Sequence, residues 1–120
     1  PTIAPQTIDY GIMEKAGRVV VIPAVDLGWN DVGSWESMFD VFQPSQDGNI
    51  ILDAEHIGLA TKNSLVVSDH TGRLIVTLGM ENVIVVDTQD AVLVCARQHA
   101  QKVRDVVDLL KKNEGVKRYL

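Results

Sequence analysis

Hydrophobic residues follow two different spacings along the chain. Near both ends they recur every three or four residues, which is the spacing of one face of a helix. From about residue 50 to residue 95, short β-branched runs alternate with turn-forming residues, which is typical of an all-β segment. The pattern therefore predicts an α+β chain that divides into residues 1–46 and 47–120.

The first 46 residues predict two short helices with a strand between them. Residues 7–15 indicate a helix, with Thr7 as its N-cap and Gly17 just beyond its end. Residues 18–25, RVVVIPAV, are a β-branched run typical of a strand covered on both faces. A second helix is expected from Ser34, whose side chain can cap it. The apolar face of this helix consists of Trp35, Met38, Phe39 and Phe42.

The remainder predicts an all-β module followed by a helix. The β-branched runs favour either a meander or a rolled solenoid, and their irregular spacing identifies no sequence repeat. After residue 96 the pattern returns to helix spacing, and Asn113 with Gly115 is expected to end that helix. Its apolar stripe comprises Ala100, Val103, Val107 and Leu110. The expected strands are 50–52, 65–67, 74–78, 83–86 and 91–95.

Composition and charge narrow the classes of partner. The 120 residues carry a formal net charge of −5, which argues against bare nucleic acid or an anionic membrane as the partner. Cys95 is the single cysteine and follows an apolar run, so we expect a small buried hydrophobe rather than a disulfide or a reactive thiol. No run is long enough to cross a membrane and no signal peptide is recognisable, so a cytoplasmic location is expected.

The segment 26–35, DLGWNDVGSW, concentrates acids, glycines and both tryptophans between the predicted strand and helix. Ligands of open α/β sheets bind at such loops, and the carboxylates of Asp26 and Asp31 are hard oxygen ligands of the kind that Mg²⁺ prefers. Gly28 and Gly33 allow tight turns and close approach to a ligand. A purely structural interpretation stays open, in which Asp31 is a turn or cap residue and the tryptophans belong to the core.

Three stretches in this order resemble the mannose-1-phosphate guanylyltransferases, which make GDP-mannose: TIDYGIMEK, RVVVIPAVDLGWNDVGSWES, and the ending from GMENVIVVDTQDAVLVCAR onwards. The resemblance covers nearly the whole chain. It implies the C-terminal edge of an α/β nucleotidyltransferase domain, a small all-β left-handed β-helix-like domain, and a terminal amphipathic helix. It further implies a Mg²⁺-dependent reaction, in which mannose 1-phosphate attacks the α-phosphorus of GTP and pyrophosphate leaves.

The resemblance also implies roles for individual residues. Asp31 matches the family's metal-ligand aspartate, and it lies beside Trp29 and Gly33, which are expected to contact substrate. A second group of expected substrate-binding residues, in the family's element at the sugar side of the cleft, is Asp9, Tyr10, Glu14 and Lys15. Lys15 is equally explained as a solvated charge at a helix end.

The family's glycine-rich nucleotide loop and its partner aspartate have no counterpart in this sequence. We therefore expect the chain to correspond to the C-terminal third of such an enzyme and to be inactive alone. A cut catalytic domain exposes apolar surface, so a homo-oligomer is expected. The alternative is a free-standing, non-catalytic β-rich oligomerisation or interaction module.

The remaining polar residues carry weaker signals. His56, His70 and His99 lack the spacing of zinc ligands. Asp87 and Asp90 are expected to be turn residues between two strands.

Overall fold

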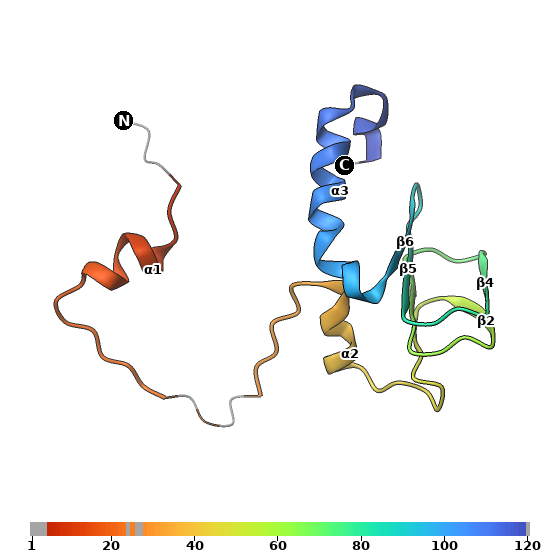
Figure 1. Ribbon diagram of the computed structural model, residues 1–120, viewed down its shortest axis with the longest axis horizontal. Coiled ribbons are helices and arrows are strands. Elements are labelled where there is room, and N and C mark those ends of the chain that lie inside the picture. Colours follow the sequence, from red (N-terminus) through yellow and green to blue (C-terminus); the bar gives the residue numbers. More distant parts are fainter. Residues whose placement is uncertain (1–4, 24, 26–27, 120) are drawn as a thin grey trace.

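The computed structural model describes residues 5–23, 25 and 28–119, and its β strands wind into a parallel β-helix (Figure 1). Strands β1, β3 and β5 are parallel neighbours in one sheet, with β6 antiparallel at its edge, while β2 and β4 form a second parallel sheet. Parallel pairing of successive coils decides for the solenoid over the meander. The strands are β1 (Ile50–Leu52), β2 (Glu55–Leu59), β3 (Leu65–Ser68), β4 (Leu74–Leu78), β5 (Val83–Asp87) and β6 (Val92–Ala96).

The register reveals a repeat that the sequence pattern did not identify. Ile50 pairs with Leu65, fifteen residues on, and Leu65 pairs with Ile84, nineteen residues on. Because the two coils differ in length, a search of the sequence for a repeat of fixed period does not detect them. At the same corner of successive coils stand Gly48, Asn63 and Asn82, with φ of 77°, 49° and 54°. Glycine and asparagine are the residues that tolerate this left-handed conformation best.

The main apolar core lies on the face of the four-stranded sheet that meets the helices. Ile50, Leu65, Ile84 and Val86 are buried there together with Ala100. The partly buried side chains packed against them are Trp35, Met38, Phe39, Leu52, Val67, Leu93 and Cys95. Of the apolar helix face predicted from Ser34 onwards, Trp35, Met38 and Phe39 therefore cover the β-helix, whereas Phe42 is exposed. Cys95 is a half-buried free thiol whose pKa is raised by burial, in line with the predicted packing role.

Polar side chains occupy the interior of the coil. The Thr61 and Thr77 hydroxyls are 2.8 Å apart, and Thr77 Oγ1 also lies 2.8 Å from His56 Nε2. Both threonines are buried and His56 is half-buried, so each polar atom in this short chain of hydrogen bonds has a partner inside the solenoid. His56 is thus a structural residue of β2, a strand that the sequence analysis missed.

The helices are short except near the C-terminus. The terminal helix is confirmed as η3 (Arg97–Lys102, a 3₁₀-helix) continuing into α3 (Val103–Lys112), which ends at Asn113. Along α3 the half-buried residues are Val103, Val107 and Leu110, which is the predicted stripe. The remaining helical segments are α1 (Ile8–Gly11), η1 (Met13–Lys15), η2 (Trp35–Ser37), α2 (Met38–Val41) and η4 (Glu114–Tyr119).

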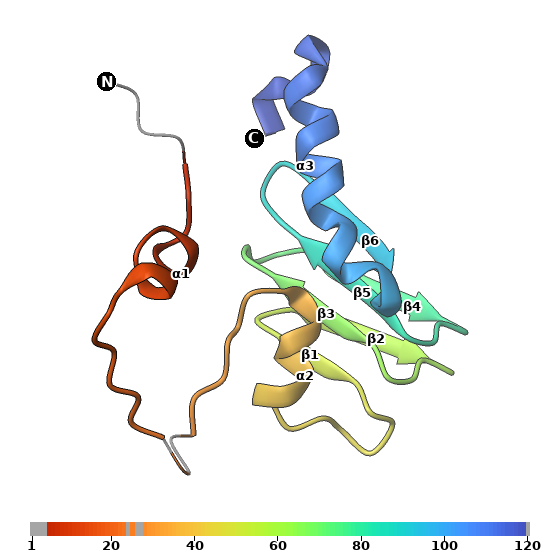
Figure 2. The ribbon, with the colours of Figure 1, turned by 60° about the vertical axis from the view of Figure 1, so that its left-hand side comes forward.

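The strand predicted at residues 18–25 is wrong for this chain. Its described residues, 18–23 and 25, belong to no strand, and Val20 and Ile22 are 88% and 84% exposed. A strand needs neighbours to accept and donate its backbone hydrogen bonds, and none of the described segments pairs with this one. Figures 1 and 2 show the stretch as an arm that carries α1 away from the β-helix. The division of the chain at residues 46 and 47 stays a prediction.

Asp87 is a second correction. It ends β5 as a buried side chain, whereas the turn that follows is formed by Thr88 and Asp90, whose side chains are joined by a 3.2 Å hydrogen bond. Of the helices in the described residues, none combines the length and the apolar character needed to cross a membrane.

Candidate functional site

The loop before η2 presents Asp31 to solvent from a tight turn. The Gly33 backbone N–H donates to the Asp31 carbonyl oxygen at 2.9 Å. Gly28 has φ of +62°, a conformation that glycine adopts without strain. Asp31 is exposed, so its carboxylate is accessible to a ligand from outside the chain. Asp26 lies outside the described residues.

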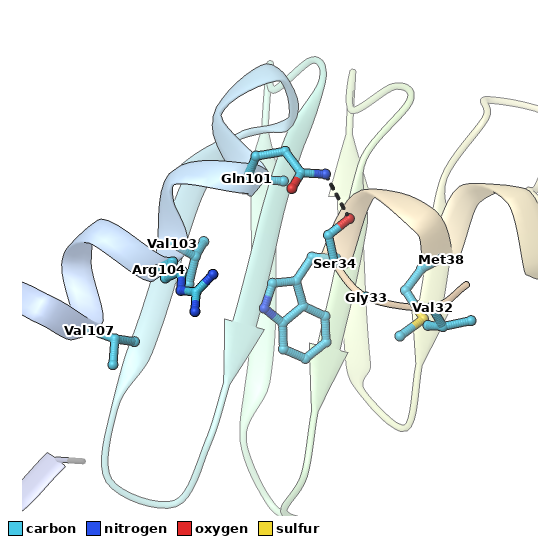
Figure 3. A pocket seen from close by; sticks show the side chains of 10 residues that line it. Val32, Gly33, Ser34, Met38, Gln101, Val103, Arg104 and Val107 are labelled. Carbon is cyan, nitrogen blue, oxygen red and sulfur yellow. Dashed lines mark hydrogen bonds between the residues drawn. The ribbon is translucent and has the colours of Figure 1, made fainter. Parts of the chain in front are cut away.

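Ser34 joins this loop to the terminal helical segment. It occupies the N-cap position of η2, as predicted, and forms a capping box with Ser37. Its hydroxyl also accepts a 3.3 Å hydrogen bond from Gln101 Nε2 (Figure 3). Ser37 closes the turn, since its Oγ accepts from the Ser34 N–H at 3.3 Å and donates to the Ser34 carbonyl at 2.6 Å.

An open pocket of about 530 Å³ lies between this loop and the terminal helix. In Figure 3, Ser34 faces Gln101, while Val103 and Arg104 lie on the terminal helix and Val32 lies beside Met38 on the other side. The walls are mostly apolar, with polar groups from Ser34, Gln101 and Arg104. Ligand sites commonly combine apolar walls with a few polar groups in this way. The lining residues are Val32, Gly33, Ser34, Trp35, Met38, Ala100, Gln101, Val103, Arg104 and Val107.

Arg97 forms a second connection beside the pocket. Its Nε lies 3.6 Å from Glu36 Oε1, and its guanidinium carbon lies 3.7 Å from the centroid of the Phe39 ring. Its backbone N–H donates to the Asn82 carbonyl at 2.7 Å, which ties it to a corner of the β-helix. Arg97 thus contacts both η2 and α2 from the first residue of η3.

The sequence-predicted site residues fall into two separate groups. The loop contains Trp29, Asp31 and Gly33. Trp29 is 75% exposed, so the interpretation of Trp29 as a core residue is wrong. In both Figure 1 and Figure 2, the helical segment α1–η1 stands apart from η2 and α2. That segment carries the exposed residues Asp9, Tyr10, Glu14 and Lys15.

No group of three or more His, Cys, Asp or Glu side chains able to hold a metal occurs among the described residues. In the described part of the loop, Asp31 is the carboxylate that could serve as a ligand to Mg²⁺. Mg²⁺ commonly takes only one or two protein carboxylates and completes its shell with phosphates and water, so the donor chemistry fits.

Sequence reasoning missed Arg97, Gln101 and Arg104. They recur at i, i+4 and i+7, the spacing of one helix face, next to the apolar stripe. A polar row bordering an apolar stripe is the signal that could have indicated them.

Residues 54–110 match the family model of the MannoseP isomerase/GMP-like beta-helix domain. The xanthan biosynthesis protein XanB of Xanthomonas campestris pv. campestris (strain B100) is 46% identical over 108 residues, covering 88% of this chain and 21% of XanB. The mannose-1-phosphate guanylyltransferase of Escherichia coli (strain K12) is 37% identical over 106 residues, again 88% of this chain and 21% of the relative.

This chain is a relative of the mannose-1-phosphate guanylyltransferases. The resemblance recognised from the sequence is confirmed. The crystal structure of a mannose-1-phosphate geranyltransferase from Thermus thermophilus superposes with a TM-score of 0.70 at 37% identity, covering 87% of this chain and 30% of that one. The chain spans about a fifth of the length of the curated guanylyltransferase relatives that it matches, and it corresponds to their C-terminal portion.

Proposed function

We propose that this chain is the C-terminal part of an enzyme that makes GDP-mannose from GTP and mannose 1-phosphate, with release of pyrophosphate. One observation carries the proposal. The match to the Escherichia coli mannose-1-phosphate guanylyltransferase spans 88% of the 120 residues at 37% identity, so it necessarily includes residues 29–35, the loop that displays Asp31. The likeness to guanylyltransferases therefore extends beyond the β-helix to the segment that bears the candidate site.

In this proposal, Asp31 helps to hold Mg²⁺ against the substrate phosphates. When bound, the metal neutralises phosphate charge, which is the main requirement of phosphoryl-type transfer. Asp31 is exposed beside the turn at Gly33. A one-carboxylate contribution suits an ion whose other ligands come from substrate and from the rest of the enzyme.

The remaining expected residues act on substrate in the same proposal. Trp29 offers an exposed apolar ring and Gly33 an approachable backbone in the loop. Asp9, Tyr10, Glu14 and Lys15 serve the sugar side of the cleft, which needs the arm before residue 28 to dock on the nucleotide-binding part of the enzyme. Residues 1–46 then form the edge of the nucleotidyltransferase domain, and the enzyme works in the cytoplasm.

A chimera tests the proposal. The matching fifth of the Escherichia coli guanylyltransferase is replaced by this chain, and GDP-mannose formation from GTP and mannose 1-phosphate is measured. We expect activity that depends on Mg²⁺ and is lost in Asp31→Asn, while the 120-residue chain alone is inactive. A folded chimera without activity, or synthesis by the isolated chain, contradicts the proposal.

A second candidate function is self-association through the β-helix, favoured by the outer face of β2 and β4. There the register places Ile57 beside Val76 and Leu59 beside Leu78. These four side chains are between 56% and 68% exposed and form an apolar surface on the paired strands. Such a surface marks an interface, and we propose a second copy of the chain as its occupant. Light scattering of the wild-type chain and of Val76→Glu tests this: a dimer that dissociates supports it, and a wild-type monomer contradicts it.

A further inference from the structure

Arg97 occupies an unusual position, because it contacts two parts of the chain that are distant from it in sequence. Its backbone is hydrogen-bonded to the Asn82 carbonyl at a corner of the β-helix. Its side chain lies against Glu36 of η2 and the ring of Phe39 in α2. One side chain therefore connects the solenoid to the helical turn that directly follows the Asp31 loop.

Arg97 and Asp31 are connected by a short path that runs through η2 and its N-cap. Glu36 lies in η2, whose N-cap is Ser34, and Ser34 is also bonded to Gln101. The next residue back, Gly33, donates its N–H to the Asp31 carbonyl. Both ends of this loop-to-helix junction are thus attached to η3, at positions one turn apart.

Charge makes Arg97 the critical member of this junction. A hollow beside it is lined by Glu36, Glu81, Asn82, Ala96, Arg97 and Gln98. Within that set Arg97 is the cation, and its Nε lies 3.6 Å from the Glu36 carboxylate. Removing the guanidinium leaves Glu36 of η2 without its ion-pair partner, which weakens the attachment of η2 to η3.

The planar guanidinium also matters. Arginine stacks on an aromatic face and pairs with a carboxylate at the same time, whereas a lysine ammonium is a compact point charge. Arg97 does both, with Phe39 and with Glu36. A lysine at this position keeps the charge but loses the stacking, so the two contributions are separable by mutation.

We propose that Arg97 is a positioning residue, which holds the Asp31 loop on the β-helix and thereby sets the geometry of the metal-binding carboxylate. This inference rests on the proposed function for its catalytic consequence. The β-helix then serves catalysis directly, by fixing a loop of the neighbouring active site, in addition to any role in assembly.

The first arm of the test measures tryptophan fluorescence at the loop-to-helix junction in the 120-residue chain. Trp29→Phe leaves Trp35, which lines the pocket, as the remaining indole. In that background we expect Arg97→Ala to shift Trp35 emission to the red and to increase its quenching by acrylamide. Lys111→Ala is the matched control, because it removes an exposed ion pair with Asp108 on the same terminal helix without touching the loop. Unchanged Trp35 emission and quenching in Arg97→Ala overturns the proposal.

The second arm measures how the activity of the chimera described above depends on the Mg²⁺ concentration. Arg97→Ala is expected to raise the Mg²⁺ concentration for half-maximal activity by about fivefold, the equivalent of one exposed cation–π contact and a surface ion pair. Arg97→Lys is expected to give an intermediate value and Lys111→Ala the wild-type value. If Arg97→Ala does not fold, Glu36→Gln takes its place as a milder change. We expect Glu36→Gln to shift the Mg²⁺ dependence in the same direction.

The two arms separate the failure of each idea. If the wild-type chimera is inactive, the proposed function fails, and the Trp35 measurement still decides whether Arg97 holds the loop. If Trp35 responds but the Mg²⁺ dependence stays unchanged, the positioning role is wrong. A loss of activity that only follows the unfolded fraction, measured by circular dichroism, also overturns it.

Discussion

Arg73 and Asp87 form an ion pair at one end of the β-helix, where Asp87 is only 1% exposed. Two further groups meet the same carboxylate: Ser68 Oγ donates to it at 3.3 Å, and His70 Nε2 lies 3.1 Å from it. A buried carboxylate is tolerated only when it is paired and hydrogen-bonded, and these three residues supply that pairing from the end of β3 and the loop between β3 and β4. The ion pair therefore fastens that loop to β5.

Removing the arginine is expected to destabilise the fold. In Arg73→Ala, Asp87 stays buried without its cation, so we expect a loss of about 1–3 kcal/mol in the free energy of unfolding, reduced because Arg73 itself is half-exposed. Equilibrium unfolding in urea measures this free energy for the wild type and the variant. Arg73→Ala combined with Asp87→Asn is the informative control, since removing both charges is expected to recover part of the loss. A double variant no more stable than Arg73→Ala contradicts this account.

The corner at Gly48 is expected to reject a side chain. A Cβ there would collide with the Asn63 side-chain amide, and φ of +77° already disfavours an L-residue. Gly48→Ala is expected to cost about 2 kcal/mol or more, whereas Gly79→Ala is expected to cost about 1 kcal/mol. Gly79 is the matched control because its φ is +64° but no atom lies within 4 Å of its Cβ position. Equal unfolding midpoints for the two variants would show that the collision is absent.

His56 is expected to make stability depend on pH. Burial lowers its pKa, so the folded state prefers the neutral ring. The unfolded chain then binds a proton more readily, and the stabilisation is present above the unfolded pKa of about 6.5 and is lost as pH falls through the folded value. Unfolding free energies between about pH 8 and pH 5 for wild type and His56→Gln measure this. We expect the decline on acidification to be shallower in the variant, and parallel curves would refute a role for His56.

Cys95 is expected to react slowly in the native chain. It is half-buried in the core and its pKa is raised by burial, so little thiolate is present at neutral pH. Labelling with a thiol reagent is expected to be slow without denaturant and rapid in urea. Rapid native labelling at the rate of a free cysteine would show that β6 does not pack against the helices as described.

The sequence predicted the β-helix strands well where burial follows a simple run of apolar residues. The bounds of β1 and β4 were predicted correctly at 50–52 and 74–78. Strand β2 was missed because Glu55, His56 and Gly58 interrupt its pattern, and parallel pairing with β4, which a local reading does not reveal, stabilises it. Tertiary context overrides propensity in the same way in the predicted strand 18–25, whose described residues, 18–23 and 25, lack strand partners.

The candidate site was predicted in part. The exposed carboxylate of Asp31 agrees with a ligand role, and that role stays a prediction. The contacts of Arg97 and Gln101 were out of reach, because they depend on how η3 leaves β6 and crosses the preceding helical turn. Side chains that join segments so distant in the sequence leave no local pattern.

The unequal coils have a consequence for engineering. Leu52 pairs with Val67 and Glu55 with Leu74, so the corner between these paired positions is four residues longer in the second coil than in the first. The strands after the corner nevertheless resume parallel pairing. A foreign peptide grafted between Leu52 and Glu55 therefore has a natural precedent one coil away, and this corner is where the scaffold offers room for a recognition tag or an epitope.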